Sequence, residues 1–296
     1  MDSRPMTEDD ISSCVDIFYT SFNALHRQHG LAEEDAADSG WLAGALRHFL
    51  ETDPHGGRIA MQDGNPVAFA SAFRRHRYWF LSFLFVLPDA QGYGIGRSLL
   101  DELVPQEDPA DVVRATVVES FQPVSTGLYA SYGMTPRSIR YGLSRVGRPD
   151  ALPELPADLG KEELAPADLE DMAKLDGRIL GFERSADHGW WDASGMKGYV
   201  YRHGDEPVGY AYVDDGFVGP ALAIDEQTLC SMVADIVRDA DDPAAVTVNT
   251  YGDAAAVFQM LLRAGARIDD DKHRFVYGSS SGPLPPSYIN FSGFLP

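Results

Sequence analysis

Glycines are clustered between residues 92 and 96, just after an apolar run that stops at Pro88. The whole stretch reads Val86-Leu87-Pro88-Asp89-Ala90-Gln91-Gly92-Tyr93-Gly94-Ile95-Gly96-Arg97. A glycine-rich turn that leads from a strand into a helix suits an anionic ligand, because a helix N-terminus has unpaired backbone N–H groups and a partial positive charge. Glycine also lets the backbone approach a pyrophosphate closely, since it has no Cβ. These residue types therefore indicate a phosphate-binding turn.

Several phosphate-binding motifs share this chemistry, and their spacing separates them. A kinase-type P-loop ends in Gly-Lys-Ser/Thr, whereas Gly96-Arg97-Ser98 has no lysine at that position. The dinucleotide pattern G-x-G-x-x-G needs a glycine where Arg97 or Leu99 stands. It also follows the first strand of a βαβ unit, whereas this turn follows a hairpin-rich stretch. A nucleotide-dependent oxidoreductase is accordingly disfavoured.

Residues 84–100 resemble the acetyl-CoA-binding motif of the GCN5-related N-acetyltransferase (GNAT) superfamily. That motif reads Arg/Gln-x-x-Gly-x-Gly/Ala after a strand ending in Val-x-Pro, and here Gln91, Gly94 and Gly96 fill its defining positions. The resemblance implies that backbone amides from Gln91 to Gly96 hold the pyrophosphate of acetyl-CoA, while the strand end lies along the pantetheine and acetyl groups. The cofactor-binding residues that it implies are Phe85, Val86, Gln91, Gly92, Tyr93, Gly94, Ile95, Gly96, Arg97 and Ser98, with no metal ion.

A second segment carries the same resemblance. In that superfamily the helix after the next strand commonly reads Asn-x-x-Ala-x-x-Leu-Tyr-x-x-x-Gly-Phe. Here Leu128-Tyr129 and Gly133 match this pattern, whereas Gln122, Ser125 and Met134 depart from it. The resemblance implies that Tyr129 is the general acid of the reaction.

Acetyl transfer to an amine needs two proton transfers. A lysine-like amine has a pKa of about 10.4 and must lose a proton before its nitrogen attacks the thioester carbonyl. The departing thiolate must gain a proton, and a tyrosine with a pKa of about 10 keeps one available at neutral pH. A strand-end N–H, at Val86, suits the charge that develops on the carbonyl oxygen. We therefore expect Tyr129 to act as the acid, with Tyr132 as a weaker candidate.

The sequence determines the base less well. Glu119 follows a predicted strand, 111–118, and is the carboxylate that we assign to the site. The alternatives are a solvated loop position for Glu119, a role for His26 or His29, and a chain of water molecules in place of one residue.

Apolar periodicity and turn residues predict the elements that position these side chains. They are helices over 7–25 and 39–50, strands over 58–62, 66–74 and 78–87, a helix over 95–104, a strand over 111–118, a helix over 123–131 and a strand over 136–146. This order matches the GNAT superfamily, so we expect an α/β (α+β) fold. The proline-rich stretch 148–160 has no periodicity and is predicted to be a linker.

Three short segments of the second half repeat the first half in the same order. Residues 164–169 resemble 6–11, residues 203–213 resemble 63–72, and residues 262–266 resemble 130–134. The repetition predicts two tandem GNAT-like domains, each a mixed, mostly antiparallel sheet flanked by helices. We expect a catalytic domain at 1–147, a linker at 148–160, a degenerate domain at 161–280 and an extended tail at 281–296.

The second half lacks the chemical parts of the first. Residues 214–221 stand where we expect the motif, contain no Gln/Arg-x-x-Gly-x-Gly, and include Pro220, which has no backbone donor. Leu261 stands at the position of Tyr129. The predicted protein therefore has one cofactor site. Residues 180–184, with His188, Trp190 and Trp191, line an acceptor or oligomer surface or else form a packed core.

Composition narrows the partners. The formal net charge is −21, from 45 acidic and 24 basic residues, which disfavours nucleic acid and is compatible with a cationic acceptor. Two distant cysteines, Cys14 and Cys230, predict reduced thiols rather than a disulfide or zinc site. No segment reads as a signal peptide or membrane span, so we expect a cytoplasmic protein.

Together these features predict an acetyl-CoA-dependent N-acetyltransferase that acts on a primary amine, in the first place that of a small molecule. A protein or peptide amine fits the same motif. A non-catalytic acyl-CoA sensor is the alternative from another class, and the presence of Tyr129 counts against it. The identity of the acceptor and the formation of a homodimer are left open.

Overall fold

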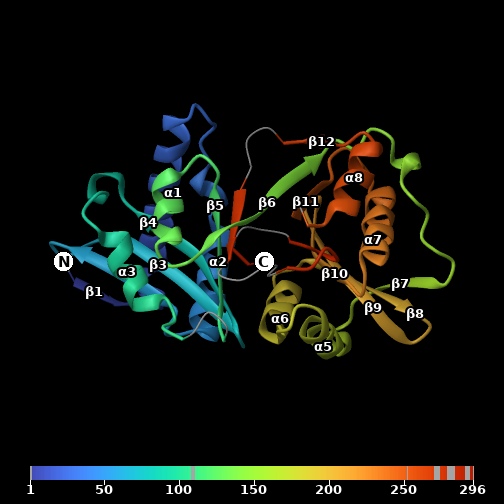
Figure 1. Cartoon of the computed structure of the whole chain (residues 1–296), viewed down its shortest axis with the longest axis horizontal. Helices are drawn as coiled ribbons and strands as arrows, with labels where there is room; N and C mark the ends of the chain where they lie inside the picture. The colour runs from blue at the N-terminus through green and yellow to red at the C-terminus, as the bar shows by residue number, and fades with distance from the viewer. Residues whose placement is uncertain are drawn as a thin grey trace. The chain divides into compact units, whose positions relative to one another are not determined.

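The computed structural model describes residues 2–107, 111–251, 253–269, 274–278, 284–290 and 294–295. The chain forms two compact units, Met1–Thr116 with Gly127–Gly133, and Val117–Thr126 with Met134–Pro296. In each unit a sheet carries helices (Figure 1). The predicted α/β (α+β) class with tandem mixed sheets is confirmed.

The first unit follows the predicted order of elements. It contains β1 (Asp2–Pro5), α1 (Ile11–Gln28), α2 (Gly40–Thr52), β2 (Gly57–Gln62), β3 (Asn65–Arg75), β4 (Tyr78–Val86) and α3 (Ile95–Leu103), together with parts of β5 (Val113–Glu119) and α4 (Pro123–Ala130). The strand order is β1-β2-β3-β4-β5. All neighbours are antiparallel except β4 and β5, which run parallel.

Helix α3 packs on one face of this sheet because small side chains make room for it. Ala60, Ala68 and Ala70 of β2 and β3 are fully buried beneath Ile95 and Leu99 of the helix. A strand normally carries larger β-branched or aromatic residues. The alanines therefore let the start of α3 lie close to the sheet.

Aromatic side chains fill the contact of the sheet with α1 and α2. Phe18 of α1 lies 4.7 Å from Phe85 and 5.7 Å from Trp41, measured between ring centroids. Phe69 stacks on Phe85 at 5.9 Å, and Phe49 of α2 lies 5.2 Å from another β3 ring. Such pairs add to the free energy of burial of their rings. The end of β4 is therefore held by rings from both helices.

The ladder between β4 and β5 is short. Parallel pairs join Tyr78 to Val113 and continue to Leu81 and Thr116, and the Thr116 hydroxyl donates to the Leu81 carbonyl at 2.8 Å. At this point the register of β3 against β4 shifts, which places an extra residue, Ser82, in β4. A bulge bends its strand and often ends the pairing on one side. Within the first unit, the last residues of β4 thus lie beyond its ladder with β5.

The second unit repeats this order. It contains β6 (Thr135–Ser144), β7 (Leu159–Glu163), α5 (Leu169–Ile179), α6 (Ser185–Ala193), β8 (Lys197–His203), β9 (Glu206–Asp214), β10 (Phe217–Ala223), α7 (Glu226–Asp239), β11 (Thr247–Tyr251), α8 (Ala255–Arg263), β12 (Arg267–Ile268), β13 (Arg274–Gly278) and β14 (Tyr288–Ile289). Its strand order is β13-β6-β11-β10-β9-β8-β7, with β12 paired to β6 and β14 paired to β10.

The duplication extends to the hydrogen bonds at the helix starts. Before α1, the Asp10 carboxylate accepts the Thr7 N–H at 2.8 Å and receives Arg4. Before α5, the Asp168 carboxylate accepts a hydrogen bond from the Ala165 N–H at 2.9 Å and one from the Arg202 guanidinium at 2.6 Å. The helices α4 and α8 end at left-handed glycines, Gly133 and Gly265, with φ of 80° and 85°. The arginines come from different strands, β1 and β8, while the Asp at the helix start and the glycine after the last helix recur in both units.

Four short strands, β1, β7, β12 and β14, lie outside the sequence predictions. β1 and β7 are polar edge strands, and Leu159 and Gly160 of β7 fall in the stretch predicted as linker. β14 falls in the predicted tail, of which residues 281–283, 291–293 and 296 lie outside the described part. The predicted domain limits at 147 and 161 differ from the unit limits, since β6 belongs to the second unit.

Candidate functional site

The turn after β4 is compact and is held by its own backbone. The Leu87 N–H donates to the Val67 carbonyl of β3 at 2.9 Å, and a single 3-10 turn, Pro88–Ala90, follows. Ala90 is buried beneath the turn. The chain then reaches the start of α3 within four residues, Gln91 to Gly94.

Two of the glycines are required by the backbone itself. Gly92 and Gly94 have φ of 85° and 81°, a left-handed conformation that disfavours side chains. A Cβ on either residue meets no heavy atom within 4 Å, so the space above both is open. Gly96 differs, because its φ is ordinary and a Cβ there meets Leu84, Val86 and Leu128 at van der Waals distance.

Backbone donors gather at this turn. The Gln91 N–H donates to the Pro88 carbonyl at 3.2 Å, and the Ser98 N–H donates to the Gly94 carbonyl at 3.0 Å. Within the described chain, no backbone hydrogen bond uses the N–H groups of residues 92–97. These donors lie at the positive end of α3, where an anion is favoured. Backbone N–H groups from residue 91 to residue 96 were predicted to hold the pyrophosphate. Of these, the N–H of Gln91 is therefore bonded within the turn itself.

The side chain of Gln91 also serves the turn. Its Nε2 donates to the Val86 carbonyl at 2.9 Å, and Ser21 of α1 donates to the same oxygen at 3.0 Å. Phe85 and Val86 are half-buried at the end of β4, and Tyr93 is 80% exposed. Arg97 and Ser98 lie exposed on the first turn of α3. The predicted cofactor residues are thus contiguous along one strand end, turn and helix start.

Helix α4 brings the predicted acid to the same end of α3. Leu128 is 3.7 Å from where a Cβ of Gly96 would lie, so the second half of α4 packs on the first turn of α3. Tyr129 is the next residue and is 5% exposed. The helix ends when Tyr132 and Gly133 donate to the carbonyls of Tyr129 and Ala130, both at 3.0 Å.

Tyr132, the weaker candidate for the acid, has a different environment. Its hydroxyl donates to Asp101 Oδ1 at 2.6 Å and lies 3.2 Å from the Arg97 carbonyl. Burial and the Asp101 carboxylate raise the pKa of Tyr132 to about 12. Arg97 in turn donates to Ser131 at 3.2 Å. The Tyr132 hydroxyl is therefore part of a clamp between α4 and the outer face of α3.

The candidates for the base lie on other elements. Glu119 is the last residue of β5, is half-buried, and belongs to the second unit. His26 of α1 is buried, and its Nδ1 donates to the Ala32 carbonyl at 2.6 Å. His29 follows α1 and is exposed. The choice of base among Glu119, His26, His29 and water is still a prediction.

The second unit has a different connection at the corresponding place. We predicted that residues 214–221 stand for the motif, and this alignment is wrong, because they form the end of β9, a turn and most of β10. The residues between β10 and α7 are Ile224 and Asp225. The Asp225 carboxylate accepts the Thr228 N–H at 2.7 Å. The phosphate turn is thus missing, and a carboxylate occupies the helix start, where it repels anions.

The core of the second unit also includes residues left open by the sequence. Arg184, His188 and Trp191 are 0–1% exposed, so they form a packed core and not an accessible wall. Arg184 pairs with Asp176 at 2.9 and 3.0 Å, and His188 Nε2 lies 3.0 Å from Asp176. Burial opposes the charge on Asp176, but Arg184 and His188 outweigh it and lower its pKa.

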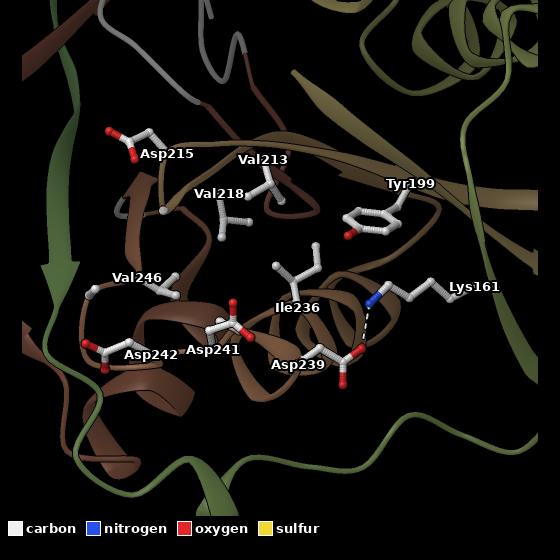
Figure 2. A pocket seen from close by; sticks show the side chains of 13 residues that line it. Lys161, Tyr199, Val213, Asp215, Val218, Ile236, Asp239, Asp241, Asp242 and Val246 are labelled. Atoms are coloured by element: carbon white, nitrogen blue, oxygen red, sulfur yellow. Dashed lines mark hydrogen bonds and ion pairs between the residues drawn. The ribbon is translucent and has the colours of Figure 1, made fainter. Parts of the chain in front are cut away.

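A hollow of about 350 Å³ lies elsewhere in the second unit (Figure 2). Val213, Val218, Ile236 and Val246 form its apolar part, and Asp215, Asp239, Asp241 and Asp242 stand around it. Lys161 is held by Asp239 at 2.8 Å and by Asp235 at 2.9 Å. The hollow adjoins the C-terminal, negative end of α7, so it does not suit a phosphate ligand.

The described residues offer neither a metal site nor a membrane span. No group of three or more His, Cys, Asp or Glu side chains there could hold a metal ion. None of the helices described is both long and apolar enough to cross a membrane. Cys14 and Cys230 are buried free thiols.

Residues 15–134 match the model of the acetyltransferase (GNAT) family. No functionally curated protein gives a significant match to the chain. A candidate acetyltransferase from Pyrococcus horikoshii has 16% identity and a TM-score of 0.72, covering 99% of this chain and 95% of its own. A tandem GNAT protein from the clavulanic acid biosynthesis pathway has 16% identity and a TM-score of 0.59, covering 94% of this chain and 97% of its own.

A GCN5-related N-acetyltransferase from Sphaerobacter thermophilus has 15% identity and a TM-score of 0.56, covering 94% of each chain. At such identities the likeness shows the fold. It extends over both units of the chain, in agreement with the internal duplication.

Proposed function

Because residues 15–134 belong to the acetyltransferase (GNAT) family, a family of acyl-CoA-dependent acyltransferases, we propose that this chain transfers an acetyl group from acetyl-CoA to a primary amine. The observation that carries the proposal is the run of N–H groups at residues 92–97, which no other backbone group of the described chain uses. They lie beside two left-handed glycines with open space above them. This arrangement suits a pyrophosphate.

The residues present fit acetyl-CoA. Backbone donors of Gly92, Gly94 and Gly96 would hold the pyrophosphate, and Phe85 and Val86 would lie along the pantetheine arm and acetyl group. Leu84, Val86 and Leu128 surround Gly96 and give the turn an apolar support. A polar turn on an apolar support excludes water from one side of a bound ligand, which strengthens hydrogen bonds to it.

The reaction forms one bond and breaks one. The amine nitrogen attacks the thioester carbonyl, the new C–N bond forms, and the C–S bond breaks. The amine proton leaves to Glu119 or to water, and the thiolate of coenzyme A takes the proton of the Tyr129 hydroxyl. We assign the acid to Tyr129, the buried neighbour of Leu128 in α4, and this is supported by the bond that the Tyr132 hydroxyl makes to Asp101.

The acceptor that we propose is a small-molecule amine. A net charge of −21 raises the local concentration of cations, and an amine of pKa about 10 arrives as a cation. A protein or peptide amine is the second candidate for the same chemistry. A screen of small amines and basic peptides with detection of released thiol separates these acceptors.

The test of cofactor binding uses two matched glycine variants. Gly94→Ala and Gly30→Ala each place a side chain on a left-handed residue with no neighbour within 4 Å, and Gly30 follows α1, outside the glycine turn. We expect acetyl-CoA at about 100 times its Kd to add about 2.7 kcal/mol of stability to the wild type and to Gly30→Ala. Gly94→Ala should show a much smaller rise in Tm. Equal rises in both variants would refute the assignment of the turn.

A further inference from the structure

In the second unit, residues 284–290 occupy the strand groove, which is the edge of β10 beyond its ladder with β11. β10 and β11 repeat the parallel pair β4 and β5, and their ladder is shorter, joining Phe217 to Thr247 and Val218 to Val248. The register of β10 against β9 then shifts between Val218 and Ala221, at the place that corresponds to the bulge at Ser82. In both units, therefore, the central strand leaves its parallel partner at a bulge.

Beyond the bulge, β10 pairs with β14. Ala221 and Leu222 face Ile289 and Tyr288 in antiparallel register, and the Ala223 N–H donates to the Ser287 carbonyl at 3.0 Å. The opposite edge of the same residues pairs with β9. β14 also contacts β11. The segment 284–290 thus lies on the edge of β10 that its parallel partner leaves.

Side chains fix the segment in this place. Tyr288, Ile289 and Asn290 are fully buried, and Leu284 and Ser287 are each 5% exposed. The Arg184 guanidinium, itself paired with Asp176, donates to the Tyr288 hydroxyl at 3.0 Å and lies 5.1 Å from the centroid of the ring.

Two residues after Tyr288, Arg140 of β6 donates to Asn290 Oδ1 at 3.2 Å. Two buried arginines therefore bind the side chains of Tyr288 and Asn290, which flank Ile289 in the sequence. Such specific contacts exceed what a loosely packed terminal extension makes.

In the first unit, the corresponding edge of β4, at Phe83 to Val86, is where we place the pantetheine arm and acetyl group. That arm binds an open strand edge with its amide groups, as an added strand does. We propose that segment 284–290 is the built-in ligand of the second unit, where it takes the place of the acyl-pantetheine arm, so that the chain binds one acyl-CoA. The proposal rests on the proposed function for its comparison with the first unit.

The second unit has no phosphate-binding turn between β10 and α7, which agrees with a peptide segment as the group bound at β10. Ile224 and Asp225 connect β10 to α7 directly, and the Asp225 carboxylate takes a donor at the helix start. A ligand without phosphates, such as a peptide strand, needs no such turn. The groove of the second unit therefore keeps strand recognition and has lost phosphate recognition.

Amide hydrogen exchange tests the occupant without any use of the reaction. A chain ended after residue 283 should exchange the amides of Ala221 and Ala223 at least about tenfold faster, because the Ala223 N–H donates to Ser287 and the N–H two residues earlier faces the same edge. The amides of β4 at Phe80 and Leu81 should keep their rates. A synthetic peptide of residues 284–296 should restore the slow exchange. Unchanged rates in the shortened chain, or no restoration by the peptide, would overturn the proposal.

Should the shortened chain lose protection in β4 as well, full-length Tyr288→Ala decides the matter. This variant removes the ring beneath Arg184 and should speed exchange at Ala221 and Ala223 alone, whereas unchanged rates would again overturn the proposal. Calorimetric titration of the full chain with acetyl-CoA should give one site. Two sites would refute the closed groove. No binding at all would count against the proposed function. The exchange rates would still test whether residues 284–290 occupy the edge of β10.

Discussion

Tyr129 and Tyr132 stand at one helix end, and we propose that Tyr129 alone acts as the acid. Tyr132 is bonded to Asp101, and burial together with that carboxylate raises its pKa to about 12. A donor already committed to a carboxylate is poorly suited to deliver its proton to a thiolate. Tyr129 is buried next to Leu128, which packs at the glycine turn. Tyr129 is thus within α4, whereas Tyr132 lies in the turn that follows it.

Replacement of Tyr129 by Phe should lower kcat by about 100-fold, because it removes the proton donor and leaves the ring in the core. The Kd for acetyl-CoA should stay close to that of the wild type, as measured by calorimetry. Tyr132→Phe is the matched control and should cost about 1 kcal/mol of stability while nearly keeping kcat. A loss of kcat in the control with full activity of Tyr129→Phe would reverse the two roles.

Single residues also mark the limit of prediction from sequence. Gln91 matches the motif, but its own N–H and side chain hold the turn, at Pro88 and Val86. Asp225 is an N-cap residue, a type that sequence can indicate, but that it stands where the first unit has its glycine turn follows only from β10 leading straight into α7. A hydrogen bond between distant groups is decided by the fold, and a pattern of residue types does not contain it.

Among the elements, long periodic segments were predicted within a few residues. The helix expected over 95–104 forms at Ile95–Leu103, and the strand expected over 78–87 forms at Tyr78–Val86. The short strands β1, β7, β12 and β14 were missed, since two to five residues are too few for a period to show. β14 consists of Tyr288 and Ile289 amid prolines and serines, and its pairing with β10 is a tertiary contact.

The stability contributed by the start of α1 depends on pH. Bonds from Arg4, and then from Thr7, hold the pKa of Asp10 at about 2, below the usual 3.8. A carboxyl with a lowered pKa in the folded state stabilises it above the unfolded pKa, and this contribution is lost as pH falls toward 2. Asp10→Asn should therefore lower the free energy of unfolding at pH 7 by about 2 kcal/mol.

Urea unfolding at pH 7 and at pH 3 measures this difference. The gap between wild type and Asp10→Asn should be smaller at pH 3, since part of the wild-type carboxyl advantage is gone there. Asp9→Asn removes a charge from the same turn at an exposed position and serves as the control. An equal gap at both pH values would mean that the side chain acts through packing and not through its charge.

At the scale of the whole molecule, the duplication could be recognised from three short sequence repeats. These repeats did not suffice to align every element of the two units. The hairpins and the final helices correspond as predicted, as β2–β3 with β8–β9 and α4 with α8. The motif position did not, because the eight residues 87–94 of the first unit are replaced by two, 224 and 225. A deletion of this size shifts any count along the chain, and the structure alone restores the register.

The net charge of the molecule makes a last, separable prediction. A charge of −21 attracts a cationic acceptor and repels the anionic cofactor, and both effects act beyond direct contact. The screening length falls from about 30 Å at 0.01 M salt to about 10 Å at 0.1 M. Raising KCl over this range should therefore increase KM for a cationic amine severalfold and leave KM for acetyl-CoA unchanged or lower.

A neutral osmolyte at equal osmolarity provides the control for solvent effects. The sign of the two salt responses carries the argument, because one field acts on ligands of opposite charge. If both KM values rise together, salt acts on the protein and not on the encounter. If only the KM of acetyl-CoA rises, the N–H donors of the glycine turn outweigh the net charge in binding the cofactor. The acceptor then reaches its site without attraction by the net negative charge. An acceptor KM that ignores salt would favour a neutral acceptor over the cationic amine proposed for this site.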